Sequence, residues 1–234
     1  MSARAVLFDL GNTLVSYYAA ADFPPILSAC LRACVGVLPT GTQLDERDLE
    51  RRALALNVER PDLSVWPLDE RLRLLFGEAA SERATLRRLA TAFMGPIFAT
   101  AVADPDALAV LGALRAQGIR TAIVSNTPWG SPASDWRSEL ERHGLLAAVD
   151  AAVFCVDAGY RKPHPAPIER ALSLLHVRPA DAMFVGDDPR WDVLGAQRAG
   201  VKAMLLSKSP VEGVLTVAGL RDVLELDFLR KTSG

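Results

Sequence analysis

The pattern of apolar and polar positions changes along the chain. The segment 4–9 carries a continuous apolar run that stops on Asp9, and such a run predicts a strand buried on both faces. From residue 15 to 103, apolar residues recur at spacings of three and four with charged residues between them. This spacing predicts amphipathic helices, and prolines such as Pro61 and Pro96 divide the segment into several short ones.

After about residue 104, short apolar runs alternate with amphipathic segments. The pattern predicts strands over 119–126, 151–156, 182–187 and 202–206, and helices over 105–118, 134–144, 165–176, 191–199 and near 219–229. Alternation of this kind predicts βαβ units and a parallel sheet. We therefore expect an α/β domain made of residues 1–14 and 104–234, with an α-helical domain, residues 15–103, inserted after the first strand.

Polar residues follow three of the predicted strands. Asp9, the pair Ser125-Asn126 and the pair Asp187-Asp188 all stand at the carboxyl ends of apolar runs, where open parallel sheets bind ligands. Lys162 of "GYRKPHP" precedes a proline, which favours an extended conformation with a freely projecting ammonium group. Each element alone is also typical of turns or helix caps. Their occurrence together at strand ends favours one shared site.

These residue types support phosphoryl transfer. Mg²⁺ prefers one or two carboxylates with substrate oxygens and water, and it would let the Asp9 carboxylate approach a phosphate dianion. Ser125 and Lys162 would hold the equatorial oxygens, where charge is stabilised in the transition state. An aspartyl-phosphate formed at Asp9 would then be hydrolysed in a second step.

The four motifs together resemble those of the haloacid dehalogenase superfamily, most of whose members are Mg²⁺-dependent phosphatases. "FDLGNTL", "IVSN", "GYRKPHP" and "FVGDDPRWDVLGAQRAGV" are similar to the motifs of the family in that order. The resemblance implies a Rossmann-like three-layer α/β sandwich. It also implies that the helical segment after the first strand is a cap over the active site.

The resemblance assigns roles in catalysis and phosphate binding. It implies that Asp9 is the nucleophile, that Ser125 binds phosphate, and that Lys162 bridges the nucleophile and the phosphate. It also implies that Asn126 contacts the substrate through its side chain or backbone.

The resemblance also implies a metal site. Asp9 and Asp187 would ligate Mg²⁺, and Asp192 would orient the metal through water. Asp188 can share either acidic role, and Thr13 would form a hydrogen bond near the nucleophile.

One position departs from the family pattern. Family phosphatases usually carry a second aspartate two residues after the nucleophile, where this chain has Gly11. The backbone carbonyl of that residue ligates Mg²⁺ and its carboxyl group protonates the leaving oxygen, so Gly11 keeps only the first function. General acid catalysis is worth about 10²–10⁴ in rate. We therefore expect a substrate with a good leaving group, such as an acyl or anomeric phosphate, or an acid supplied by the cap or by water.

Two alternatives to a phosphatase remain open at this point. A 2-haloacid dehalogenase uses the same aspartate without a metal, but three nearby acids, Asp187, Asp188 and Asp192, would repel one another without a cation. A non-catalytic protein that binds phosphate and Mg²⁺ would also keep the same residues.

The composition limits the partners. A formal net charge of −2 gives no electrostatic reason to expect nucleic acid or an anionic membrane. The resemblance implies a small phosphorylated metabolite as the ligand. The three cysteines have no metal-ligand or CxxC spacing, and the first apolar run is too short for a signal peptide. We expect a cytoplasmic protein, either a monomer or a homodimer.

Overall fold

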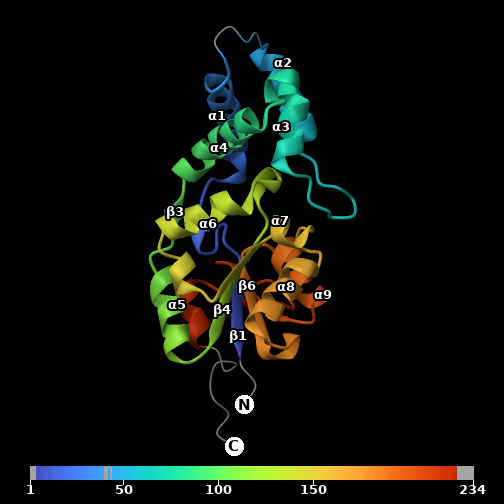
Figure 1. Cartoon of the computed structure of the whole chain (residues 1–234). Coiled ribbons are helices and arrows are strands. Elements are labelled where there is room, and N and C mark those ends of the chain that lie inside the picture. The colour runs from blue at the N-terminus through green and yellow to red at the C-terminus, as the bar shows by residue number, and fades with distance from the viewer. Residues whose placement is uncertain (1–3, 40–41, 43, 226–234) are drawn as a thin grey trace, which may run out of the picture.

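A six-stranded parallel sheet forms the centre of the structure (Figure 1). The computed structural model describes residues 4–39, 42 and 44–225. The strands of the sheet are β1 (Ala5–Phe8), β4 (Arg120–Ser125), β5 (Ala151–Phe154), β6 (Ala182–Gly186), β7 (Lys202–Leu206) and β8 (Leu215–Val217). Their spatial order is β5-β4-β1-β6-β7-β8, which is the doubly wound order of Rossmann-like sheets. The predicted α/β fold with a parallel sheet is confirmed.

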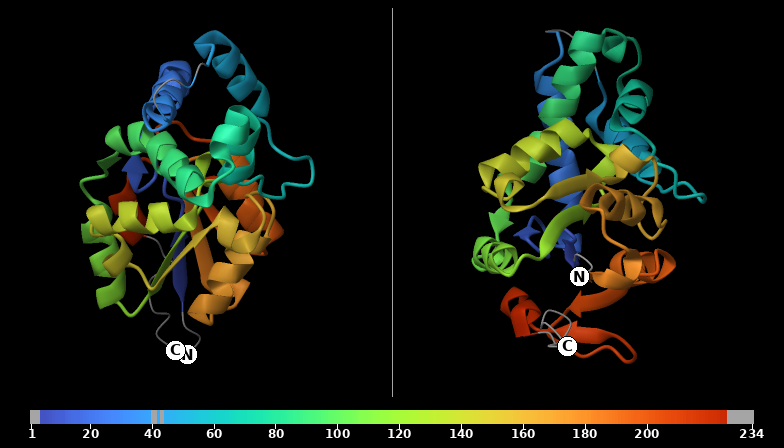
Figure 2. Two further views of the ribbon diagram at one scale, coloured as in Figure 1. Left: turned by 45° about the horizontal axis from the view of Figure 1, so that its top comes forward. Right: turned by 60° about the horizontal axis from the view of Figure 1, so that its bottom comes forward.

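Helices cover both faces of the sheet (Figure 2). Alternate residues of β1 explain this, because Val6 and Phe8 join one apolar cluster while Ala5 and Leu7 join another. Strands buried on both faces read as unbroken apolar runs. The first cluster includes α5 (Ala107–Ala116), α6 (Ala133–Arg142) and the 3₁₀ helix η7 (Leu220–Glu225), and the second includes α8 (Ala166–Leu175) and α9 (Leu194–Arg198).

The segment from residue 17 to 101 is helical, as its spacing predicts, and lies above the sheet in Figure 1. It contains α1 (Phe23–Gly36), α2 (Glu46–Leu56), α3 (Leu68–Phe76) and α4 (Arg83–Ala99). An antiparallel pair of two-residue strands, β2 (Val15–Ser16) and β3 (Val102–Ala103), joins its two ends. The division of the chain into a core and a cap at residues 15 and 103 stays a prediction.

Some elements differ from the sequence prediction. The pair β2 and β3 and the short strand β8 were not predicted, because two or three residues carry no readable periodicity. Strand β5 ends at Phe154 rather than at residue 156, because a short helix, α7 (Cys155–Ala158), begins there. The Phe154 N–H donates to the Asp157 carboxylate of this helix at 2.9 Å. The predicted closing helix is 3₁₀ over η7, and its continuation beyond residue 225 lies outside the described residues.

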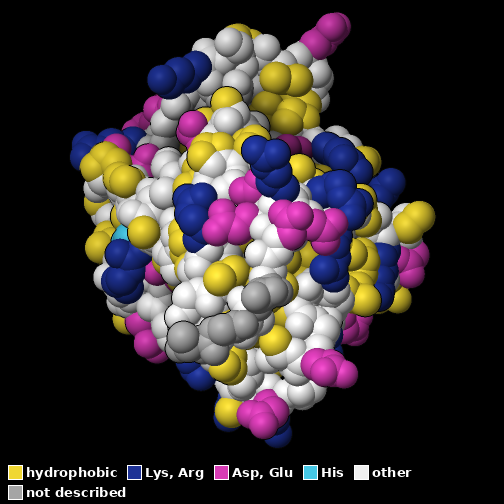
Figure 3. Space-filling view, turned by 90° about the horizontal axis from the view of Figure 1, so that it is seen from above, with side chains coloured by type: hydrophobic (Ala, Val, Ile, Leu, Met, Phe, Trp, Pro, Cys, Tyr) yellow, Lys and Arg dark blue, Asp and Glu magenta, His cyan; other side chains and the backbone are white. Residues whose placement is uncertain are grey.

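The face of the molecule that lies at the top of Figure 1 carries both charge signs. In Figure 3 acidic and basic side chains lie next to one another on this face. Among the described residues, no helix has both the length and the apolar character needed to cross a membrane.

Candidate active site

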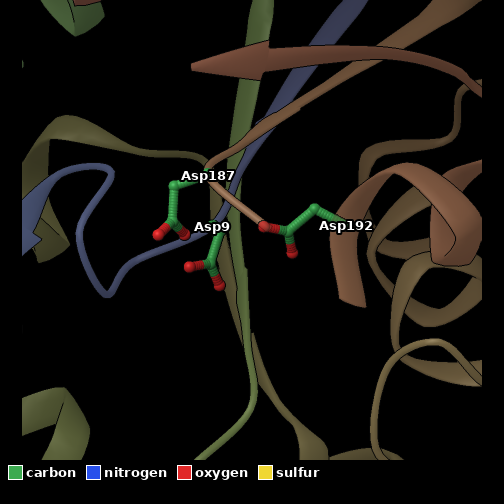
Figure 4. Close-up of side chains that lie close together, drawn as sticks. All are labelled: Asp9, Asp187 and Asp192. Atoms are coloured by element: carbon green, nitrogen blue, oxygen red, sulfur yellow. The ribbon is translucent and has the colours of Figure 1, made fainter. Parts of the chain in front are cut away.

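Three carboxylates meet at the carboxyl end of the sheet (Figure 4). Asp9 follows β1, Asp187 follows the neighbouring strand β6, and Asp192 lies in the helical turn after it. One oxygen of each carboxylate lies within 4.8 Å of the others. The structure therefore brings together acids that are far apart in sequence, because β1 and β6 pair in parallel and end at the same edge.

Lys162 joins two of these carboxylates. Its ammonium group donates to Asp9 Oδ1 at 2.6 Å, to Asp192 Oδ1 at 2.6 Å and to the Val124 carbonyl at 2.8 Å. The expected freely projecting side chain is therefore wrong, since Lys162 is only 1% exposed and all three of its N–H groups are used. Burial alone lowers the pKa of Lys162, but the charges of Asp192 and Asp9 outweigh it and raise that pKa.

Asn126 holds the backbone of Lys162. Its Oδ1 accepts from the Lys162 N–H at 2.8 Å, and its Nδ2 donates to the Lys162 carbonyl at 3.0 Å. The Asn126 side chain thus positions the lysine, a role that sequence reasoning missed. Ser125 ends β4, and its hydroxyl lies 3.4 Å from the Asn126 carbonyl in the cavity that also contains Asp9. The predicted contact of Ser125 with phosphate is compatible with this place.

The acidic segment after β6, residues 187–192, contains three aspartates, two of which accept hydrogen bonds from backbone N–H groups. The Asp188 carboxylate accepts from the N–H groups of Arg190 at 2.7 Å and Trp191 at 2.8 Å, so it caps the following helical turn. Asp192 Oδ2 accepts from the Asp188 N–H at 3.1 Å. A Cβ atom on Gly186 would overlap the Asp192 carboxylate. Glycine is therefore needed there for Asp192 to reach the end of the strand.

The turn after Asp9 leaves space beside the nucleophile. Asn12 has a left-handed φ of 56°. A Cβ atom on Gly11 would have no contact within 4 Å among the described residues, and Gly11 lines the cavity of Asp9. The Thr13 hydroxyl is buried and has no hydrogen-bond partner in the described part of the chain. The hydrogen bond predicted for Thr13 near the nucleophile has no counterpart among the described residues and stays a prediction.

The charges of the site fit a divalent cation. Burial raises the pKa of Asp187 to about 6, and the neighbouring Asp192 and Asp188 add to the shift. Burial also raises the pKa of Asp192 to about 6 and raises that of Asp9, while Lys162 acts in the opposite direction on both. Lys162 supplies one positive charge against three carboxylates. Because Mg²⁺ prefers carboxylate oxygens, this donor set suits it.

We expect Asp187→Asn to raise the melting temperature of the metal-free protein near neutral pH. The pKa of Asp187 is about 6 in the folded state against a usual 3.8. The folded state therefore binds the proton more tightly, and ionisation of Asp187 lowers the stability as the pH rises from about 4 through about 6. Thermal unfolding with EDTA at several pH values measures this.

The gain from Asp187→Asn should shrink as the pH falls through about 6 and vanish only below the usual pKa of 3.8, where the wild-type carboxyl group is protonated in both states. Asp188→Asn is the matched control, because asparagine can keep the helix cap and the variant removes only the smaller repulsion that Asp188 adds, so its gain at neutral pH should be smaller than that of Asp187→Asn. A destabilised Asp187→Asn protein at neutral pH without metal would contradict the prediction.

Two cavities join at this site. One of about 270 Å³ contains Asp9, Lys162 and the acidic segment. The other, of about 280 Å³, lies toward the helical segment and is lined by Tyr17, Tyr18 and Trp136. Residues 11, 12, 125 and 126 line both cavities. The space beside Asp9 therefore suits a small organic substrate.

Comparison with known proteins decides the family. The profile of the haloacid dehalogenase-like hydrolases matches residues 3–200. The chain belongs to this family. The predicted family resemblance is thus confirmed, and the carboxylates and Lys162 described above lie within the matched region.

Relatives of this hydrolase include phosphatases. A phosphoglycolate phosphatase from Rhodospirillum rubrum is 34% identical over 231 residues, which cover 95% of this chain and 89% of that protein. A phosphoserine phosphatase from Thermus thermophilus is 32% identical over 154 residues, 62% of this chain and 58% of that protein.

Solved structures of the family share the fold. A HAD phosphatase from Thermococcus onnurineus matches with a TM-score of 0.67 and 20% identity, covering 95% of this chain and 96% of that chain. A 2-haloacid dehalogenase from Pseudomonas syringae matches with a TM-score of 0.67 and 21% identity, covering 95% and 97%. Since one fold serves both activities, the fold does not choose between them.

Proposed function

We propose that this protein is a Mg²⁺-dependent phosphatase that acts on a small phosphorylated metabolite through an aspartyl-phosphate at Asp9. The observation that carries the proposal is the group of three carboxylates, Asp9, Asp187 and Asp192, around a single buried lysine. A dehalogenase that works without a metal would have no cation to neutralise this excess of negative charge. The phosphatase names of the relatives support the same reaction class.

The first half-reaction transfers the phosphoryl group to Asp9. A carboxylate oxygen of Asp9 attacks the phosphorus atom, and the bond between phosphorus and the leaving oxygen breaks. Gly11 offers no acid, so the leaving oxygen takes its proton from water. Lys162 holds the attacking carboxylate in place through its 2.6 Å contact with Oδ1.

The second half-reaction restores the enzyme. A water molecule attacks the phosphorus of the aspartyl-phosphate, inorganic phosphate leaves, and the Asp9 carboxylate is regenerated. Lys162 can bridge to the phosphate only by exchanging one of its three acceptors, and the Asp9 oxygen is the one whose charge is lost on phosphorylation.

The proposal assigns ligands to the metal and to the phosphate. Asp9, Asp187 and the Gly11 carbonyl would hold Mg²⁺, which neutralises phosphate charge and so permits the approach of the Asp9 anion. The Ser125 hydroxyl would donate to a phosphate oxygen. Asp192 keeps Lys162 in place by their ion pair.

The proposal is tested by measuring the hydrolysis of acetyl phosphate and p-nitrophenyl phosphate. Each is assayed with Mg²⁺, with EDTA, and after Mg²⁺ is restored. We expect turnover that EDTA abolishes and Mg²⁺ restores, with acetyl phosphate preferred. Metal-independent release of halide from 2-chloropropionate would instead show a dehalogenase. Mg²⁺ binding without turnover of either phosphate would show a binding protein.

A further inference from the structure

A third cavity adjoins the catalytic one and is rich in arginine. Its volume is about 420 Å³, and Asn126 and Arg161 line both this cavity and that of Asp9. Its charged lining residues are Arg71, Arg161, Arg190 and Glu59. Three guanidinium groups thus face one carboxylate, which leaves a positive balance beside the phosphate site.

Arg71 is a buried cation without an acidic partner. It projects from α3 and is 5% exposed. Its guanidinium carbon lies over two indole rings, 4.8 Å from the Trp66 centroid and 5.3 Å from the Trp129 centroid. It donates to the carbonyls of Leu56 at 2.9 Å and Val58 at 3.3 Å. Its Nε is buried without a hydrogen-bond partner, and no ion pair to it occurs among the described residues.

A buried charge without a counter-ion is destabilising. Burial, followed by the nearby Arg161 and Arg60, lowers the pKa of Arg71 to about 10, so Arg71 remains charged at neutral pH. An anion in the cavity would supply the missing charge.

Arg161 connects this cavity to the catalytic residues. It precedes Lys162 directly, and its Nη1 donates to the Thr127 carbonyl at 2.8 Å. Its Nε lies 3.7 Å from Glu59 Oε1, and Arg190 lies 3.4 Å from the other oxygen of Glu59. Both separations exceed a good charge-assisted hydrogen bond. Glu59 is therefore shared and loosely held, and Arg161 keeps N–H groups for another acceptor.

We propose that Arg71 and Arg161 bind a second anionic group of the substrate, a carboxylate or a second phosphate, while its reacting phosphate lies at Asp9. Planar guanidinium groups match both kinds of anion through paired hydrogen bonds. This inference rests on the proposed function and narrows its substrate class to metabolites that carry a second anionic group besides the reacting phosphate.

The test compares kcat/KM for 2-phosphoglycolate, for propane-1,3-diol bisphosphate and for ethyl phosphate, which has no second anion. We expect Arg161→Gln to lower kcat/KM for a substrate with the fitting second anion about 10–100-fold more than for ethyl phosphate, mainly through KM. Arg71→Lys should act in the same direction. The substrate that loses more identifies the second anion as carboxylate or phosphate.

Arg190→Gln is the matched control, because Arg190 lines the same cavity but its side chain is 64% exposed and lies over Trp191. It should change the ratio between substrates no more than about threefold. A structural effect would lower kcat/KM for all substrates alike, and an Arg161→Gln protein with that behaviour would overturn the subsite.

Failure of the proposed function is separable from failure of the subsite. If the wild type hydrolyses none of these phosphates nor p-nitrophenyl phosphate, it is not a phosphatase. Calorimetric titration with 2-phosphoglycolate and with the bisphosphate, in the presence of Mg²⁺, then decides the subsite. A Kd that Arg161→Gln raises at least tenfold supports it, whereas an unchanged Kd or undetectable wild-type binding of both probes overturns it.

Discussion

Asp9→Asn should abolish phosphate hydrolysis, with a fall in kcat of about 10⁴-fold or more. The amide oxygen is a far weaker nucleophile than the carboxylate, and the variant also removes one negative charge from the metal site. Asparagine has nearly the same shape, and Lys162 keeps its bonds to Asp192 and the Val124 carbonyl. The loss therefore reports chemistry rather than unfolding. Release of inorganic phosphate from acetyl phosphate measures it.

Two observations control for the fold and for the role of Asp9. Circular dichroism and the melting temperature should show that the variant remains folded. Rapid quenching of the wild type in acid should trap phosphate on the peptide that contains Asp9 and not in the variant. Residual turnover within tenfold of the wild type would contradict a nucleophilic Asp9.

Gly11→Asp should speed the hydrolysis of phosphates that have poor leaving groups, because it restores a general acid. Such an acid is worth about 10²–10⁴ in rate. The cavity has room, since a Cβ atom at this position meets nothing within 4 Å among the described residues. The neighbouring carboxylates disfavour a further negative charge, so they should raise the pKa of the new aspartate and favour its acid form. The kcat for ethyl phosphate measures the gain.

Gly11→Asn is the matched control for this gain, because it has the same size and cannot donate a proton from a carboxyl group. With p-nitrophenyl phosphate, whose leaving group needs no proton, Gly11→Asp should bring little benefit. Equal effects of Asp and Asn at position 11, or no gain with ethyl phosphate, would show that another group already supplies the acid.

The active-site acids could be predicted because strand ends are visible in sequence. Asp9 and Asp187 follow apolar runs that are buried on both faces, and parallel strands end at a common edge. Other details had no such signal. The burial of Lys162, the hold of Asn126 on its backbone and the capping by Asp188 all depend on which atoms meet across loops.

The sequence by itself determined the α/β class, the helical segment after β1 and the residues that gather at the sheet edge. Periodicity and strand-end polarity are local properties, so one chain suffices to read them. Only the tertiary structure decided how charge is distributed, because hydrogen bonds and desolvation depend on distance in space. The cavity of Arg71 and Arg161 is the clearest case, since it combines α3, the loop after β4 and the segment "GYRKPHP" that contains Arg161. No periodicity in the sequence links those three segments.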